Sequence, residues 1–128
     1  VKQNYLLIHL FLNDNFYKIH NIRRDGNSAT INVELLPTHP IYKGHFPGQP
    51  VVPGVCTLTI IKECIAKVLG YSVSYAGIKE CKYMSALIPE EKLYITISIT
   101  IDENKGVKAL VNRDSTQETV LKLKAEIK

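Results

Sequence analysis

Strict alternation of apolar and polar positions dominates the second half of the chain. From Leu93 to Ile101 every odd-numbered residue is apolar, and the residues between them are Tyr, Thr or Ser. The same period of two returns in residues 107–111 and 121–127, and it occurs earlier in residues 31–35. A period of two places alternate side chains on opposite faces of a strand. These four segments are therefore predicted strands with one buried face.

Turn residues separate the predicted strands. Asp25-Gly26-Asn27 precedes residues 31–35, and Asn104-Lys105-Gly106 precedes residues 107–111. Glycine beside Asp, Asn or Lys between two alternating segments is typical of a hairpin connection. We therefore expect residues 17–24 to be the strand that pairs with the first of these segments.

One segment has the period of a helix. Pro53-Gly54 at its start and Gly70 at its end predict a helix over about 54–69. Seven apolar residues cover about half of its circumference: Leu58, Ile60, Ile61, Cys64, Ile65, Val68 and Leu69. Such a helix must be covered, and the strands are the available cover. The prediction is an α+β fold in which a curved, mostly antiparallel sheet wraps around one long central helix.

Composition narrows the class of protein. The chain has 128 residues, of which 45% are hydrophobic and 22% charged, so we expect one globular domain over residues 1–128. It contains no apolar run of the about 18–20 residues that a membrane-spanning helix needs. The cysteines Cys56, Cys64 and Cys81 form neither an even set nor a C-x-x-C pair. We expect free thiols in a soluble cytoplasmic protein, with no metal site and no cofactor.

The net charge of +4 comes from basic residues that are scattered along the sequence. Only Arg23 and Arg24 are adjacent. A nucleic-acid-binding protein more often concentrates its basic residues on one stripe with interleaved aromatics. We therefore expect no nucleic-acid partner, although the charge permits a weakly acidic one.

The segment from Pro37 to Val55 carries the functional information. It has five prolines and three glycines, which a regular element cannot accommodate, and it ends at the start of the predicted helix. His45 lies within it. A histidine near a helix N-terminus suggests chemistry, because that end presents free N–H groups and a partial positive charge.

Residues 44–55, GHFPGQPVVPGV, resemble the signature of the 3-hydroxyacyl-[acyl-carrier-protein] dehydratases. The resemblance extends more loosely to about residues 31–101, and it implies the hot-dog fold. It also implies removal of water from a carrier-bound acyl thioester, in the synthesis of fatty acids or related lipids and polyenes. His45 matches the catalytic histidine of that family. Gly54 matches the residue whose backbone N–H polarises the thioester carbonyl, and a glycine there lets substrate approach the backbone.

The resemblance fails at the third catalytic position. The family has an acidic residue fourteen positions after the histidine, and this sequence has Thr59 there. The nearest carboxylate is Glu63, one helical turn later, so Glu63 is the candidate third catalytic residue beside His45 and Gly54. Phe46, Pro53, Val55 and Thr59 are expected to contact the substrate.

Three functions stay open on these grounds. The first is a dehydratase that acts on acyl-carrier-protein or coenzyme A thioesters. The second is a non-catalytic subunit that binds acyl thioesters and has lost the acid, and the third is a hot-dog thioesterase. The side of the helix that carries Val55 and Cys56 needs a second covering surface, so we expect a homodimer or a higher even oligomer.

Overall fold

The computed structural model of the protein describes residues 17–36, 54–88 and 93–128. The elements in these ranges are β1 (Tyr17–Asp25), β2 (Ser28–Leu35), α2 (Gly54–Leu69), β3 (Tyr75–Tyr83), β4 (Leu93–Ile101), β5 (Gly106–Arg113) and β6 (Thr119–Ile127).

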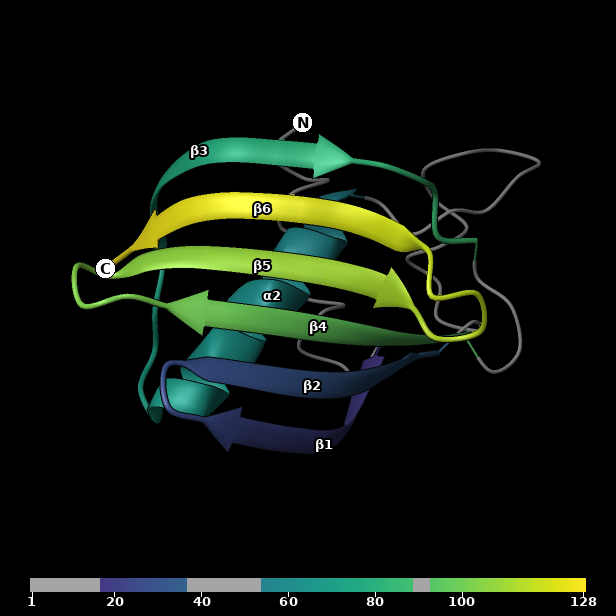
Figure 1. Ribbon diagram of the computed structural model, residues 1–128, viewed down its shortest axis with the longest axis horizontal. Helices are drawn as coiled ribbons and strands as arrows, with labels where there is room; N and C mark the ends of the chain where they lie inside the picture. Colours follow the sequence, from purple (N-terminus) through teal and green to yellow (C-terminus); the bar gives the residue numbers. More distant parts are fainter. Residues whose placement is uncertain (1–16, 37–53, 89–92) are drawn as a thin grey trace, which may run out of the picture.

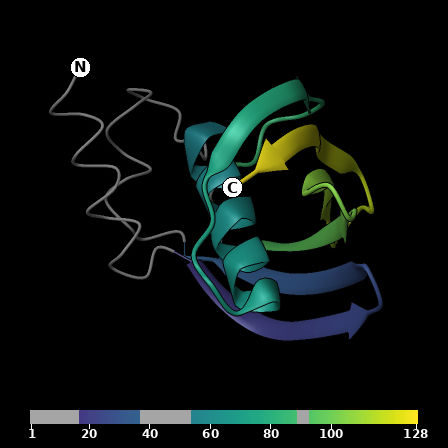
Figure 2. The ribbon, with the colours of Figure 1, turned by 90° about the vertical axis from the view of Figure 1, so that its left-hand side faces the viewer.

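The six strands form one sheet in the order β1-β2-β4-β5-β6-β3, and every neighbouring pair is antiparallel. β1 and β3 are the two edge strands (Figure 1). The sheet curves, and α2 lies against its concave face (Figure 2). In the described residues one helix is wrapped by an antiparallel sheet. This is the α+β, hot-dog arrangement that the sequence predicts, and the prediction is confirmed.

The alternating residues form the face of the sheet that packs on α2. Ile95 and Ile97 of β4 and Ile31 of β2 are fully buried, and Leu121 of β6 continues the same layer. Burying one such side chain contributes about 1.5–3 kcal/mol. A shift of register by one residue would turn this layer to solvent, so the alternation fixes the register as well as the strands.

The buried face of α2 is displaced around the helix relative to the one that the sequence predicts. Ile60, Ile61 and Ile65 are fully buried, as expected, and so is Cys56. The expectation that Cys56 lies on the uncovered side of the helix is therefore wrong. Cys56 precedes Ile60 by one helical turn, so it belongs to the same buried stripe. Val55, which is 42% exposed, does lie on the uncovered side.

Side chains from both edge strands tie α2 to the sheet. The Tyr75 hydroxyl of β3 donates a hydrogen bond of 2.7 Å to the Leu58 carbonyl. From β1, an Arg24 guanidinium nitrogen donates a bond of 3.1 Å to the Val68 carbonyl, near the end of the helix. Carbonyls in the last turn have no partner within a helix, so a cation there is favourable. These contacts fix the position of α2 between the two edges.

β4 and β5 form the hairpin that the sequence predicts at residues 104–106. Gly106 is the first residue of β5, and the left-handed residue is Lys105, with a φ of 63°. The Asp102 carboxylate organises the turn, because its Oδ1 accepts hydrogen bonds from the backbone N–H groups of Asn104 and Gly106. A Cβ on Gly106 would lie 2.5 Å from Asp102 Oδ2, so glycine is required for close approach and not for φ. Gly26, with a φ of 60°, has the predicted role.

Candidate active site at the start of helix α2

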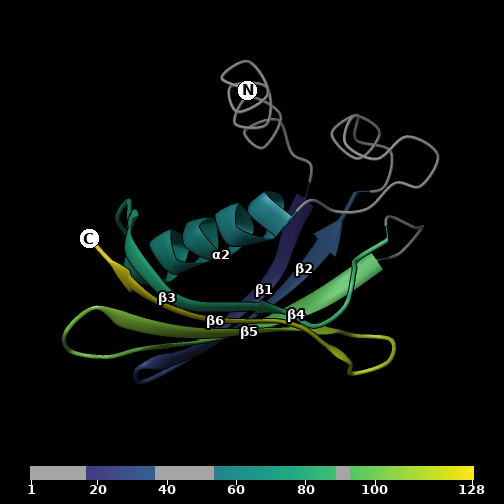
Figure 3. The same ribbon diagram turned by 90° about the horizontal axis from the view of Figure 1, so that it is seen from above.

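The first turn of α2 and the end of β3 meet at the same end of the sheet (Figure 3). Gly54 begins the helix, and the aromatic ring of Tyr83 covers it. A Cβ on Gly54 would lie 2.6 Å from the Tyr83 hydroxyl oxygen and 2.7 Å from the ring carbon that bears it. Real Cβ atoms do not approach other atoms so closely. Glycine at this position therefore allows the Tyr83 hydroxyl to lie directly against the helix backbone.

A cavity of about 350 Å³ opens beside this contact. Gly54 and Thr57 line it from the helix, while Tyr83, Ser85 and Leu87 line it from the end of β3 and the segment that follows. Thr57 is buried. Backbone N–H groups in the first turn of a helix have no partner within the helix and carry partial positive charge. This cavity is therefore suited to a ligand that presents a carbonyl or a developing oxyanion.

Thr59, at the position where the resembled family has its acid, and Glu63, the candidate acid, lie further along α2. The Thr59 hydroxyl donates a hydrogen bond of 2.9 Å to the Val55 carbonyl one turn earlier, so its proton is directed at the helix backbone. The Glu63 carboxylate accepts a hydrogen bond from the Tyr17 hydroxyl at the start of β1. Burial first, and then this hydrogen bond, raise the pKa of Tyr17 well above its ordinary value. Tyr17 therefore stays protonated and remains a donor to Glu63.

Glu63 does not lie beside Gly54 in the same chain. About two and a half turns separate them, which is about 13.5 Å along the helix axis. In a 3-hydroxyacyl thioester a single carbon separates the carbonyl carbon from the carbon that loses its hydroxyl. One substrate therefore cannot place its carbonyl at Gly54 and its hydroxyl at Glu63 of the same chain. His45, Phe46 and Pro53 lie outside the described residues.

The buried cysteines near the site are poor nucleophiles. Burial raises the pKa of the Cys56 thiol to about 12, and burial is also the largest cause of the rise of the Cys64 pKa to about 12. A thiol that stays protonated at neutral pH is not activated. Nowhere in the described ranges do three or more His, Cys, Asp or Glu side chains gather as a metal site would require.

Sequence reasoning missed Tyr83, Ser85 and Tyr17 as candidate site residues. Tyr83 lies within the range that resembles the family, about residues 31–101. No motif or residue spacing in the sequence links Tyr83 to Gly54. The contact depends on β3 lying at the edge of the sheet beside the start of the helix. Tyr17 was placed on a strand, but its contact with Glu63 depends in the same way on the order of the strands.

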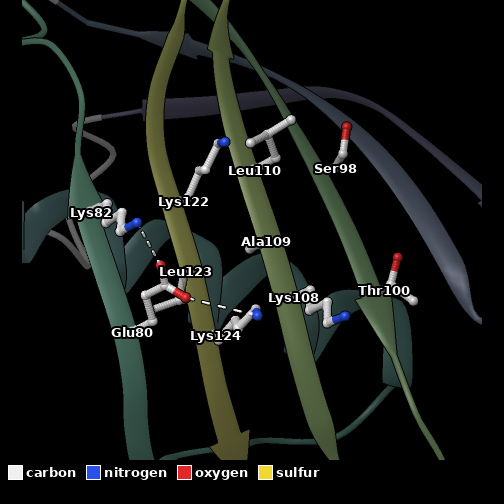
Figure 4. Close-up of a pocket in the computed structure, with 10 residues that line it drawn as sticks. All are labelled: Glu80, Lys82, Ser98, Thr100, Lys108, Ala109, Leu110, Lys122, Leu123 and Lys124. Carbon is white, nitrogen blue, oxygen red and sulfur yellow. Dashed lines mark ion pairs between the residues drawn. The ribbon is translucent and has the colours of Figure 1, made fainter.

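A second cavity, of about 410 Å³, lies on the face of the sheet turned away from α2 (Figure 4). Lys82 and Lys122 are direct cross-strand partners, and so are Lys108 and Lys124. The carboxylate of Glu80 lies 3.1 Å from the Lys82 ammonium and 3.8 Å from that of Lys124. Basic residues that are scattered in the sequence thus gather on one surface. The sheet separates this surface from the start of α2, so it is not part of the candidate active site.

Solved structures confirm the fold class that these elements define. The dehydratase heterocomplex ApeI:P from Xenorhabdus doucetiae superposes with a TM-score of 0.75 at 23% identity, over 86% of this chain and 96% of that one. A dehydratase domain of the curacin polyketide synthase module CurF gives a TM-score of 0.63 at 16% identity, over 87% of this chain and 42% of that one.

The sequence comparisons then give the family. The model of the ApeI-like family, described as ApeI dehydratase, matches residues 21–122, and the chain belongs to this family. The 3-hydroxyacyl-[acyl-carrier-protein] dehydratase FabZ of Hydrogenobaculum is 35% identical over 96 residues, which are 64% of each protein. FabZ of Ehrlichia canis is 30% identical over 93 residues, which are 64% of this chain and 63% of that one. The chain thus spans somewhat less than two thirds of the length of these curated relatives.

No helix in the described part of the chain is long and apolar enough to cross a membrane.

Proposed function

We propose that this protein is a dehydratase that removes water from 3-hydroxyacyl thioesters attached to an acyl carrier protein, or adds it in reverse. The observation that carries the proposal is the match to the ApeI-like dehydratase family over residues 21–122, which includes the whole of the Gly44–Val55 segment and α2. The FabZ relatives, which bear the name of that reaction, support the same substrate class.

The reaction needs three groups, and the sequence offers candidates for two of them in the Gly44–Val55 segment. A base must take the α-proton, and His45 is the candidate. A donor must stabilise the charge that develops on the thioester oxygen, and the Gly54 N–H, at the start of α2, is the candidate. An acid must protonate the departing hydroxyl. Thr59 does not suit that role, since its hydroxyl donates to Val55 and its pKa is far above neutrality.

Glu63 can act as the acid only if a second copy of the chain brings it to the site at Gly54. Within one chain the distance to Gly54 excludes it, but a neighbouring copy can bring its own Glu63 to this site. We infer that the protein is a homodimer, paired through the exposed edge of β3. Ile78 of β3 is 46% exposed and Met84, directly after β3, is 54% exposed. Large apolar side chains at an unpaired strand edge favour pairing with another chain. Light scattering after size exclusion tests this, and a folded monomer at micromolar concentration would contradict it.

The experiment for the activity is hydration of a crotonyl thioester on an acyl carrier protein. His45→Ala should lower turnover by about 10²–10⁴-fold, because that is the usual contribution of a general base. His20→Ala is the matched control. His20 lies on β1 in a surface pair with Glu34, at 2.7 Å, and its loss should leave turnover unchanged. Equal turnover in wild type and His45→Ala would remove His45 from the mechanism.

One observation favours a second candidate, a non-catalytic subunit that binds acyl thioesters. The Thr59 hydroxyl is engaged with the helix backbone, and by the resemblance Thr59 stands where the family has its acid. Such a subunit would work beside a catalytic paralogue, and the related ApeI:P structure is a heterocomplex. The purified protein would then bind the thioester without turning it over, and activity would appear only when the paralogue is added.

A further inference from the structure

We propose that the hydroxyl of Tyr83 is a second hydrogen-bond donor to the thioester oxygen of the substrate, acting beside the backbone N–H of Gly54. This inference rests on the proposed function, and it gives a catalytic role to a residue at the end of β3. Tyr83 would contact the reacting carbonyl without gaining or losing a proton.

The position of the hydroxyl carries the inference. Tyr83 ends β3, Gly54 begins α2, and both lie at the same end of the curved sheet (Figure 3). The Tyr83 oxygen is the atom that a Cβ on Gly54 would meet first, at 2.6 Å. The O–H group therefore lies against the residue that the proposed mechanism uses to polarise the substrate. In this proposal the carbonyl oxygen of the bound substrate lies between these two donors.

The surroundings support a polar ligand in this cavity. Ser85 lines the cavity beside Tyr83, and its hydroxyl oxygen is buried without a hydrogen-bond partner among the described residues. Most buried polar groups in proteins are paired, so an unpaired one requires an explanation. A thioester bound in the cavity brings polar atoms close to this hydroxyl.

The ionisation state of Tyr83 suits a donor. Burial first, and then the hydrogen bond that its hydroxyl donates to the Cys81 thiol, raise the pKa of Tyr83 to about 12. Sulfur is a weak acceptor, so a bound carbonyl oxygen competes with Cys81 for the single phenolic proton. The phenol therefore keeps its proton across the pH range of an ordinary assay. Its contribution should not titrate below about pH 10.

The chemical step balances without any further reactant. The base takes the α-proton, and the electron pair of the C–H bond moves onto the thioester to give an enolate oxygen. Tyr83 and Gly54 donate hydrogen bonds to that oxygen. The enolate then forms the carbon–carbon double bond as the bond to the 3-hydroxyl breaks, and the departing hydroxyl takes up the proton that the base removed and leaves as water. Removing one donor from such an oxyanion site typically costs about 10²–10³-fold in kcat.

Tyr83→Phe is the test, because it removes the hydroxyl and keeps the ring. With crotonyl carrier protein as the substrate, kcat should fall by about 10²–10³-fold, with little change in KM and no change in the shape of the pH profile. Tyr71→Phe is the matched control. Tyr71 is a tyrosine of similar exposure that follows the other end of α2, and its variant should behave as wild type. Wild-type kcat in Tyr83→Phe overturns the proposal.

A spectroscopic measurement separates this proposal from the proposed function. Isotope-edited infrared spectra of a bound crotonyl thioester, labelled with ¹³C at the carbonyl, report hydrogen bonding to that oxygen directly. The stretch should lie lower in wild type than in Tyr83→Phe. If wild type binds the thioester without turnover, the proposed reaction fails, and this frequency difference still supports the donor. Equal frequencies in the two proteins, or no binding by wild type, overturn it.

Discussion

Replacing Gly54 with alanine tests whether the contact between the helix start and Tyr83 matters for function. The new Cβ would lie 2.6 Å from the Tyr83 oxygen, about 0.8 Å short of the 3.4 Å at which ordinary contact begins. Tyr83 must therefore move by nearly 1 Å. Tyr83 is 54% exposed, and the atoms that the new Cβ would meet are at the tip of its side chain. The ring can therefore rotate towards solvent. We expect the free energy of unfolding to change by less than about 1 kcal/mol, since alanine is also the better helix former.

Turnover should respond far more than stability. A misplacement of about 1 Å in a positioned group can cost about 10²-fold in rate, so Gly54→Ala should lower kcat by about that factor. The assay is hydration of a crotonyl carrier protein, with urea unfolding of the same samples. The double variant Gly54→Ala, Tyr83→Ala identifies the cause. If the displaced tyrosine is responsible, Gly54→Ala costs little in the Tyr83→Ala background. The same cost in both backgrounds would refute this reasoning and would mean that the substrate itself meets the new methyl group.

Three further predictions concern the acid position, the buried thiols and the β4–β5 turn. Thr59→Glu should raise turnover by up to about 10²–10⁴-fold, because the new carboxylic acid restores a general acid. Thr59→Gln is the uncharged control, and equal rates for the two variants would contradict this prediction. Cys56 and Cys64 have a pKa of about 12 when folded against an ordinary 9.0. The unfolded chain therefore binds fewer protons above pH 9. The free energy of unfolding is therefore unaffected by these thiols below pH 9. It falls between pH 9 and 12, by up to about 1.4 kcal/mol for each thiol and each pH unit. Urea unfolding at about pH 8 and about pH 10.5 measures this fall, and a Cys64→Ala variant should show a smaller one; equal pH dependence in both would count against it. Gly106→Ala should lower the free energy of unfolding by about 1–3 kcal/mol, because it displaces the Asp102 carboxylate from its turn hydrogen bonds. In an Asp102→Ala background Gly106→Ala should cost much less. An equal cost in both backgrounds would refute this explanation.

The helix and most strands could be predicted because each is encoded by neighbouring residues. The alternation in residues 93–101 gives β4 with its exact ends, and Pro53-Gly54 with Gly70 gives both ends of α2. β3 is different. As an edge strand it exposes most of its side chains, including Ile78, so it lacks the clean alternation of a strand with one buried face. The local pattern of residues 75–83 therefore predicts no strand.

The contacts of the candidate site could not be predicted, because they join elements that are distant in the sequence. Tyr83 meets Gly54, and Tyr17 meets Glu63, only once the order of the strands is known. The sequence predicts a turn at Gly106, but nothing in it reveals that the Asp102 carboxylate lies against this glycine. The role of a single residue here depends on its neighbours in space more than on its type.

The measurement that tests the central claim most directly is an NMR spectrum of a crotonyl acyl carrier protein incubated with the purified wild-type protein in deuterium oxide. A dehydratase running in reverse adds water across the double bond, so we predict a 3-hydroxybutyryl thioester that carries one deuterium at the α-carbon and remains attached to the carrier. A crotonyl thioester that is bound but unchanged, or one that is cleaved to free acid, would contradict the account.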